Sequence, residues 1–296
     1  MRLGLASMIP ITGKAHDLGN GFRVTRLLPQ SNVRSIGPFV FLDYFGPVDF
    51  APGQGIDVRP HPHIGLATVT YLFEGAQTHR DSIGSVQDIR PGDVNWMTAG
   101  RGITHSERTP ADARAHGHRM HGVQSWVALP REHEETAPDF QHIGANDLPQ
   151  WQDKSVNMRL IAGEAFGLTS PVKTFSPLFY ADAQFEAGGA LHYDASHQER
   201  AFLVIDGDVH SQESQSHGAG TFLMLAPGQE ITLYADAPAR VLLLGGAPLD
   251  GPRHIWWNFV SSERDRIERA KQEWKSGAFG TIPGDDQEFI PLPEPR

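Results

Sequence analysis

Residues 59–65 read RPHPHIG, and residues 102–107 read GITHSE. Each stretch carries two potential metal ligands two positions apart, His61 with His63 and His105 with Glu107. In a β-strand, residues i and i+2 project from the same face of the sheet. If both stretches form strands and these strands are neighbours, the four side chains converge in one cavity.

Three imidazoles and one carboxylate form a ligand set for a single divalent metal ion. They leave about two positions of an octahedral shell open, which is typical of catalytic metal sites. The set suits iron, manganese, nickel, copper, cobalt and zinc. The alternative is that both pairs are ordinary strand residues, because a single HxH or HxE pattern arises by chance. The presence of both pairs in glycine-containing stretches at matching strand positions favours metal binding.

Turn signals divide most of the chain into short runs with β-propensity. In the first half a run ends at Glu74-Gly75, and the next begins after Pro91-Gly92-Asp93. Asp206-Gly207-Asp208 and Pro227-Gly228-Gln229 repeat this order in the second half. The repetition predicts an all-β fold of two related jelly-roll units, each a β-sandwich or barrel. The expected strands are residues 22–28, 39–44, 68–73, 94–97, 121–129, 155–162, 178–185, 200–205, 222–225, 230–234 and 240–244.

The C-terminal part of the chain has a different pattern. Residues 262–275 carry Ile267, Ala270 and Trp274 at helical spacing, with Ser262 as the candidate N-cap. This predicts a short C-terminal helix followed by a proline-rich tail. We expect an N-terminal metal-binding domain at residues 1–145, a C-terminal domain at 146–255, and the helix and tail at 256–296. Residues 130–149 are polar and contain several prolines, and are expected to form a surface connection.

The composition of the 296-residue chain excludes several classes of site and partner. It contains no cysteine, so disulfides and thiolate metal sites are ruled out, and we expect a cytoplasmic protein. The formal net charge of −10 disfavours direct binding to nucleic acid. No run of about 18 apolar residues is present, so no membrane span is expected. The apolar patch at residues 1–10 is too short and broken for a signal peptide.

Several of these strings together resemble the signature of the pirin family. They are HPHIG at residues 61–65, TVTYLFEG at 68–75, HRDS at 79–82 and PGDVNWMTAGRGITHSE at 91–107, with GPFVFLDYFGP at 37–47 as a further match. The likeness is dense over residues 20–130 and looser beyond. Ile64, Leu66 and Ala67 depart from it, because many pirins have a charged, an aromatic and an acidic residue there.

The resemblance implies a fold and a metal centre. Pirins are bicupins, in which two jelly-roll cupin domains face each other. The N-terminal domain holds one mononuclear metal, usually Fe(II), and the family pattern places its ligands at His61, His63, His105 and Glu107. Some members are similar to quercetin 2,3-dioxygenases, which open the flavonol ring with O2 and release carbon monoxide. Another member acts as a nuclear cofactor of transcription factors.

Two function hypotheses follow from the residues and the resemblance. The leading one is a metal-dependent dioxygenase that acts on a small aromatic or enolic substrate, as in the ring cleavage of a flavonol with O2. Glu107 would then be either a fixed ligand or the catalytic base that takes the substrate hydroxyl proton. The alternative is a non-catalytic iron-binding redox sensor that binds a protein partner. Another cupin activity, such as isomerisation at the metal, is a third option.

The first half of the chain contains further histidines besides the candidate ligands. His79 and Asp81, expected on a loop after Gly75, would either orient a ligand or lie in a solvated turn. His116, His118 and His121 are interpreted as ordinary loop and strand-end residues, with the alternative that His118 or His121 flanks the metal cavity.

The second half contains only part of a comparable histidine pattern. His192, His197 and Glu199 resemble a first cupin motif, but the matching PGQEITL string at residues 227–233 has no histidine. We therefore expect a degenerate second domain without metal. Trp256 and Trp257 are expected to be core aromatics.

Overall fold

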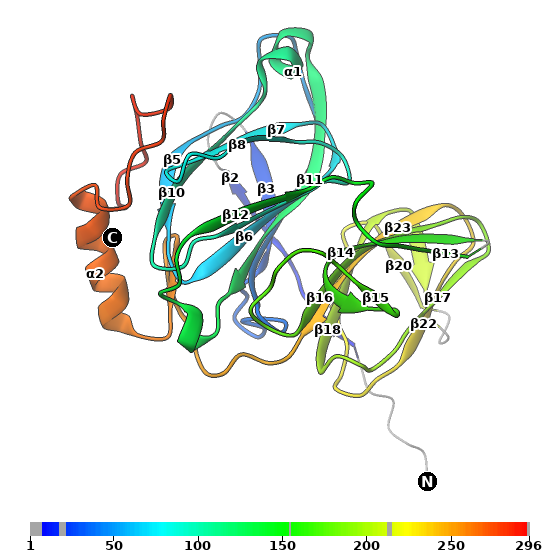
Figure 1. Cartoon of the computed structure of the whole chain (residues 1–296). Helices are drawn as coiled ribbons and strands as arrows, with labels where there is room; N and C mark the ends of the chain where they lie inside the picture. Colours follow the sequence, from blue (N-terminus) through cyan, green and yellow to red (C-terminus); the bar gives the residue numbers. More distant parts are fainter. Residues whose placement is uncertain (1–7, 18–21, 154, 212–214, 295–296) are drawn as a thin grey trace. The chain divides into compact units, whose positions relative to one another are not determined.

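The computed structural model describes residues 8–17, 22–153, 155–211 and 215–294. These residues form two compact units (Figure 1). The first unit contains the described residues within 15–26, 41–145 and 249–296, and the second contains those within 1–14, 27–40 and 146–248. Residues 1–7, part of the N-terminal apolar patch, and residues 295 and 296 of the tail lie outside the described residues.

Two antiparallel sheets build most of the first unit. The larger one contains, in order, β12 (Asp139–Ile143), β9 (Val94–Thr98), β6 (Leu66–Glu74), β11 (His118–Ala128), β4 (Phe39–Phe50), β3 (Arg23–Leu28) and β2 (Lys14–Asp17). The smaller one contains β5 (Asp57–His63), β10 (Ile103–Arg108), β7 (Gln77–Asp81) and β8 (Val86–Ile89). Side chains of β10 contact those of β6 and β11, so the sheets face each other as in a jelly roll.

Short elements complete the first unit. They are α1 (Ala111–His116), the 3-10 helix η1 (Arg131–His133), β24 (His254–Trp256), β25 (Phe259–Ser261) and α2 (Arg264–Lys275). The helix α2 lies with the tail beside β5 and β10 (Figure 1). It packs on an apolar cluster that joins Ile64, Phe259, Ile267 and Phe279. Ile64, where many pirins carry a charge, is thus covered by the C-terminal segment.

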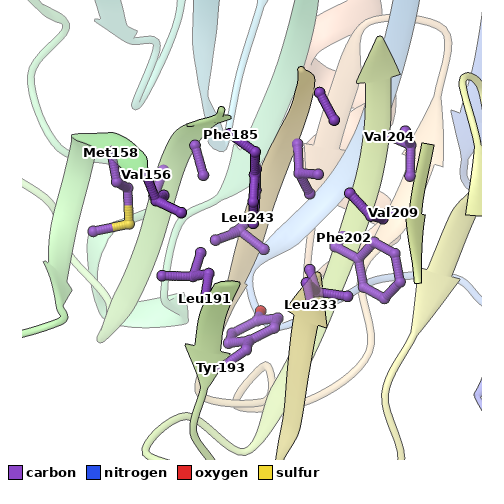
Figure 2. Close-up of a cluster of buried hydrophobic side chains, with 14 of the residues drawn as sticks. Val156, Met158, Phe185, Leu191, Tyr193, Phe202, Val204, Val209, Leu233 and Leu243 are labelled. Atoms are coloured by element: carbon purple, nitrogen blue, oxygen red, sulfur yellow. The ribbon is translucent and has the colours of Figure 1, made fainter. Parts of the chain in front are cut away.

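The second unit has the same two-sheet plan. Its larger sheet contains β1 (Ile9–Pro10), β21 (Phe222–Met224), β18 (Glu199–Asp206), β23 (Ala239–Gly246), β16 (Leu178–Phe185), β14 (Val156–Ala165) and β13 (Gln150–Gln152), with β15 (Leu168–Thr169) beside β14. Its smaller sheet contains β17 (Gly189–Tyr193), β22 (Ile231–Ala235), β19 (Asp208–His210) and β20 (Ser216–Gly218). Apolar side chains fill the space between the strands, among them Leu191, Tyr193, Phe202 and Leu233 (Figure 2).

The all-β prediction is confirmed, and each predicted strand overlaps an observed one. Two predictions about loops and connections were wrong. Residues 130–149 do not form only a surface connection, because β12 pairs with β9 at the edge of the larger sheet. The segment after Gly75 is not a loop, because β7 pairs with both β10 and β8, which leaves the side chains of His79 and Asp81 buried. Both strands are rich in polar residues, so their sequences lack the apolar pattern of a strand.

The C-terminal helix is confirmed, but its predicted N-cap is not. The helix begins at Arg264, with Glu263 in the N-cap position. Ser262 is engaged elsewhere, because its backbone N–H and its hydroxyl donate to the buried carboxylate of Glu134. Among the described residues, none of the helices has both the length and the apolar character needed to cross a bilayer.

Candidate metal centre

The pairing of β5 with β10 brings three of the four predicted ligands together, namely His61, His63 and His105. The strands are antiparallel, with His105 opposite His61 and Ile103 opposite His63. The register shifts beyond His105, where β5 carries an additional residue at Arg59-Pro60. Proline has no N–H to donate, so it fits a bulge, where regular ladder bonding is interrupted. His61, His63 and His105 consequently project to one side of the sheet.

These three histidines form a compact buried group. The three residues are 6%, 1% and 0% exposed, respectively. The ring centroids of His61 and His105 lie 4.4 Å apart, and those of His63 are 5.1 Å from His61 and 5.0 Å from His105. One potential ligand atom from each ring lies within 4.8 Å of the other two. This spacing matches three ligands around one ion.

Hydrogen bonds at Nδ1 of His61 and His63 indicate which ring nitrogen of each is left to bind a metal. His61 Nδ1 contacts the carbonyl oxygen of Arg59 at 2.8 Å, and His63 Nδ1 contacts that of Asn258 at 3.1 Å. Each Nδ1 therefore donates its proton, and the Nε2 atom is left unprotonated for a metal. His105 Nε2 is buried and has no hydrogen-bond partner among the residues that the structure describes. A buried nitrogen with no partner is unfavourable in a protein interior, and a metal ion would satisfy it.

Burial keeps this group neutral. It lowers the pKa of His61, although the nearby charge of Glu107 raises it in part. The pKa values of His63 and His105 lie well below the usual range, first because of burial and then because of the neighbouring histidines. Neutral imidazole is the form that binds metals, so these shifts favour a metal site at physiological pH.

Glu107, the fourth predicted ligand, is not part of the three-histidine group, but its charge acts on nearby His61. Its carboxylate is anchored by one oxygen. Gln124 Nε2 donates to Oε1 at 2.8 Å, and Thr70 Oγ1 donates to the same atom at 3.3 Å. Among the described residues, Oε2 accepts no hydrogen bond. This oxygen is therefore available to a metal or to a substrate hydroxyl.

His79 and Asp81 form a chain of contacts to His105. Asp81 Oδ2 lies 2.9 Å from His79 Nε2, and His79 Nδ1 lies 3.4 Å from His105 Nδ1. The Asp81 carboxylate favours the proton on His79 Nε2, so His79 Nδ1 can accept the proton of His105 Nδ1. The chain thus directs the lone pair of His105 Nε2 toward the centre. Sequence reasoning named both residues but placed them on a loop.

A small cavity adjoins Glu107 within the first unit. Its volume is about 30 Å³, room for about two water molecules. Its walls combine apolar and polar side chains: Phe22, Val24, Asp43, Phe45, Ile56, Val58, Thr70, Gln77, Glu107, Met120 and Gln124. Asp43 is paired with Arg26 at 2.8 Å. Within the described part of the chain, Glu107 is therefore the carboxylate that faces this space without a cationic partner.

His116, His118 and His121 lie outside the centre. His116 Nδ1 bonds to the Asp112 carbonyl, His118 stacks on Phe50, and His121 Nε2 contacts the hydroxyl of Tyr44. None of these rings belongs to the three-histidine group.

The partial histidine pattern of the second unit is not brought together around one point. His192 is exposed, and the carboxylate of Glu199 accepts a hydrogen bond from the backbone N–H of Gly37. His197 contacts the carbonyl oxygen of Glu164. Among the described residues, the His61, His63 and His105 group is the one with metal-binding geometry.

Family models match both halves of the chain. The Pirin model matches residues 21–127, and the Pirin C-terminal cupin domain model matches residues 180–280. A pirin-like protein of Caulobacter vibrioides is 51% identical over 281 residues, which covers 94% of this chain and 96% of the relative. The chain belongs to the pirin family. This confirms the resemblance seen in the sequence and assigns both units as cupin domains.

Solved structures of other proteins have a similar fold to this pirin. A quercetin 2,3-dioxygenase from Acinetobacter baumannii superposes with a TM-score of 0.89 at 36% identity, covering 98% of this chain and 95% of that one. A bacterial pirin from Escherichia coli, solved in complex with nickel(II), has a TM-score of 0.64 at 18% identity and covers 82% of this chain and 100% of that one. The second similarity is one of fold alone.

Proposed function

We propose that this pirin is a metal-dependent dioxygenase of the quercetin 2,3-dioxygenase type. The observation that carries the proposal is the group of three buried, neutral imidazoles beside a carboxylate with one free oxygen. His61, His63, His105 and Glu107 would hold one ion, with Fe(II) as the proposed metal. The name of the structurally similar Acinetobacter enzyme supports the reaction class.

Each residue of the centre has a distinct role in this proposal. A bound redox-active metal would supply Lewis acidity and electron transfer to O2. Glu107 Oε2 would complete the ligand set before substrate binds; once released from the ion, Oε2 accepts the proton of the substrate hydroxyl, and the resulting anion is a better electron donor. Gln124 and Thr70 hold Oε1, so the carboxylate keeps its orientation during this step. Asp81 and His79 fix the tautomer of His105.

The cavity beside Glu107 supports a small aromatic or enolic substrate. Phe22, Phe45 and Met120 provide apolar walls, and Gln77 and Gln124 provide polar groups. Pockets for flavonol-sized ligands usually exceed about 300 Å³. The cavity here is about 30 Å³, so a flavonol would bind only after these side chains move apart. We place the reaction in the cytoplasm, in keeping with a chain without cysteine.

The test is aerobic turnover of quercetin by iron-loaded protein. The expected result is loss of the flavonol absorbance with release of carbon monoxide, at a rate proportional to bound iron. The variant His105→Ala should lose iron and activity together, whereas His116→Ala, at an exposed site outside the centre, should retain both. Iron bound at full occupancy without consumption of quercetin would reject this substrate and favour a sensor role.

A further inference from the structure

Strand β10 presents different residues to its two sides. His105 and Glu107 point toward the metal centre, whereas Thr104, Ser106 and Arg108 contact the C-terminal segment that follows α2. Side chains alternate along a strand, so any displacement of the outer three residues also moves the inner two. The outer contacts therefore bear on the geometry of the centre.

Asp285 is the main contact on the outer side of β10. Its Oδ2 accepts hydrogen bonds from Ser106 Oγ at 2.7 Å and from Arg108 Nε at 2.7 Å. Its Oδ1 accepts one from Arg108 Nη2 at 2.8 Å. The paired guanidinium and carboxylate fix both distance and angle, and such bidentate pairs are among the stronger hydrogen-bonded contacts in proteins. The side chains of Asp285 and Arg108 are only 11% and 20% exposed, which limits screening by solvent.

The same segment also holds β5 and α2. The backbone N–H of Ile290 donates to the carbonyl oxygen of Pro60, at the bulge just before His61, at 2.8 Å. Trp274 Nε1, in α2, donates to the carbonyl oxygen of Ile290 at 3.1 Å. The hydroxyl of Thr104 donates to the carbonyl oxygen of Gly280 at 3.0 Å. Residues 279–290 thus join both ligand-bearing strands and the helix.

Strand β5 depends on contacts with the C-terminal segment because of its place in the sheet. It is the edge strand of the smaller sheet, and its pairing with β10 is interrupted at Arg59-Pro60. An edge strand with a bulge has few backbone bonds to hold it in place. The bond from Ile290 to Pro60 supplies one at this point.

We propose that Asp285 is a positioning residue for the metal centre and that residues 279–290 act as a clasp on the two ligand-bearing strands. The proposal depends on metal binding by the site described above, but not on its substrate. When the clasp is closed, Ser106 and Arg108 hold β10 in the register that directs His105 and Glu107 inward. When it is open, the ligand geometry relaxes and the metal is held less tightly.

The test compares Asp285→Asn with Asp286→Asn. The two acidic residues are neighbours, but the Asp286 carboxylate accepts a hydrogen bond only from the exposed Gln287 side chain among the described residues. The probes are Co(II) and Ni(II), with the Kd measured by competition against a chromophoric chelator. Asp285→Asn should raise the Kd about 10-fold or more, the range seen for outer-shell changes at metal sites. Asp286→Asn should leave it unchanged.

A spectroscopic signature separates positioning from a general loss of stability. The visible absorption of bound Co(II) reports ligand geometry, and it should change in Asp285→Asn but not in Asp286→Asn. Asp285→Glu keeps the charge and should restore part of the affinity. If Asp285→Asn fails to fold, Ser106→Ala removes one contact of the clasp and serves instead. Unchanged Kd and Co(II) spectra in a folded Asp285→Asn protein would overturn the proposal, whether or not quercetin is a substrate.

Discussion

At the scale of single residues, the three histidines of the candidate metal centre are the most predictable part of this pirin. Because residues i and i+2 of a strand point to the same face, the spacing of His61 and His63 is enough to predict that their side chains lie together. His79 was harder to place, because its role depends on the pairing of a polar strand with β10. Hydrogen bonds from Gln124 and Thr70 to Glu107 cross from one sheet to the other, and no local pattern in the sequence indicates them.

The variant Glu107→Gln distinguishes the two roles considered for Glu107, metal ligand and catalytic base. The amide has about the same size as the carboxylate, but it cannot act as a base and take the proton of the substrate hydroxyl. We expect kcat to fall about 10²- to 10⁴-fold, the usual contribution of a general base, while the three histidines retain metal. Metal content measured by elemental analysis and kcat measured by quercetin consumption separate the two roles. Complete loss of metal in Glu107→Gln would instead assign the carboxylate as an essential ligand.

Asp81 and His79 should affect metal affinity without contacting the metal. His79→Ala removes the acceptor for His105 Nδ1, so His105 loses the bond that selects its tautomer. We expect a 10- to 100-fold weaker affinity, roughly the effect of losing an outer-shell partner. Calorimetric titration with Ni(II) measures it, with His116→Ala as the control. Equal affinities in the two variants would contradict a role for this chain of contacts.

At the scale of elements, apolar and β-branched runs predict the strands that carry the core. The polar strands β7 and β12 are formed by pairing with neighbours, so their position depends on residues far away in the chain. The same holds for the C-terminal segment. Its proline-rich sequence indicates an extended chain, but its attachment to β10 depends on Ser106 and Arg108, which lie about 180 residues earlier.

Gly65 lies two residues after His63, at a point where the backbone of β25 packs closely against it. Its φ is +68°, and an added Cβ would lie 2.0 Å from the carbonyl oxygen of Val260. Gly84 also has a positive φ, +97°, but an added Cβ would meet nothing within 4 Å. Gly84→Ala should cost about 1–2 kcal/mol from backbone strain. Gly65→Ala should cost about 1–3 kcal/mol more, because the contact with β25 must open. Urea denaturation of both variants measures the difference.

The clasp should weaken in acid, and the direction follows from Asp285. Its hydrogen bond with Arg108 lowers the pKa of Asp285 below the usual 3.8, against the opposing effect of burial. A carboxyl with a lowered pKa stabilises the folded state above its unfolded pKa, and this stabilisation is lost as pH falls through the folded value. The difference in unfolding free energy between wild type and Asp285→Asn should therefore be constant above about pH 5 and shrink toward pH 3. Urea midpoints over this range test it; a difference that grows in acid would contradict the assignment.

At the scale of the whole molecule, two cupin units have different interiors. The first gathers buried histidines and a carboxylate between its sheets, whereas the second fills the corresponding space with side chains such as Leu191, Tyr193 and Leu233. The general two-unit plan follows from the repeated turn signals. No local pattern in the sequence signals that residues 27–40 belong to the second unit, because this depends on contacts with residues far away in the chain, such as the hydrogen bond from the Gly37 N–H to Glu199.

This difference predicts that metal stabilises the molecule unevenly. A ligand that binds only the folded state stabilises it by about 2.7 kcal/mol at a free concentration of 100 Kd. Metal should therefore slow hydrogen exchange in β5 and β10, whose ligands it joins, and leave β17 and β22 almost unaffected. Hydrogen-exchange mass spectrometry with Ni(II), and again after chelation by EDTA, measures both sets of strands in one experiment. His105→Ala should abolish the protection; equal protection of the second unit would mean that the units unfold as one or that the second also binds metal.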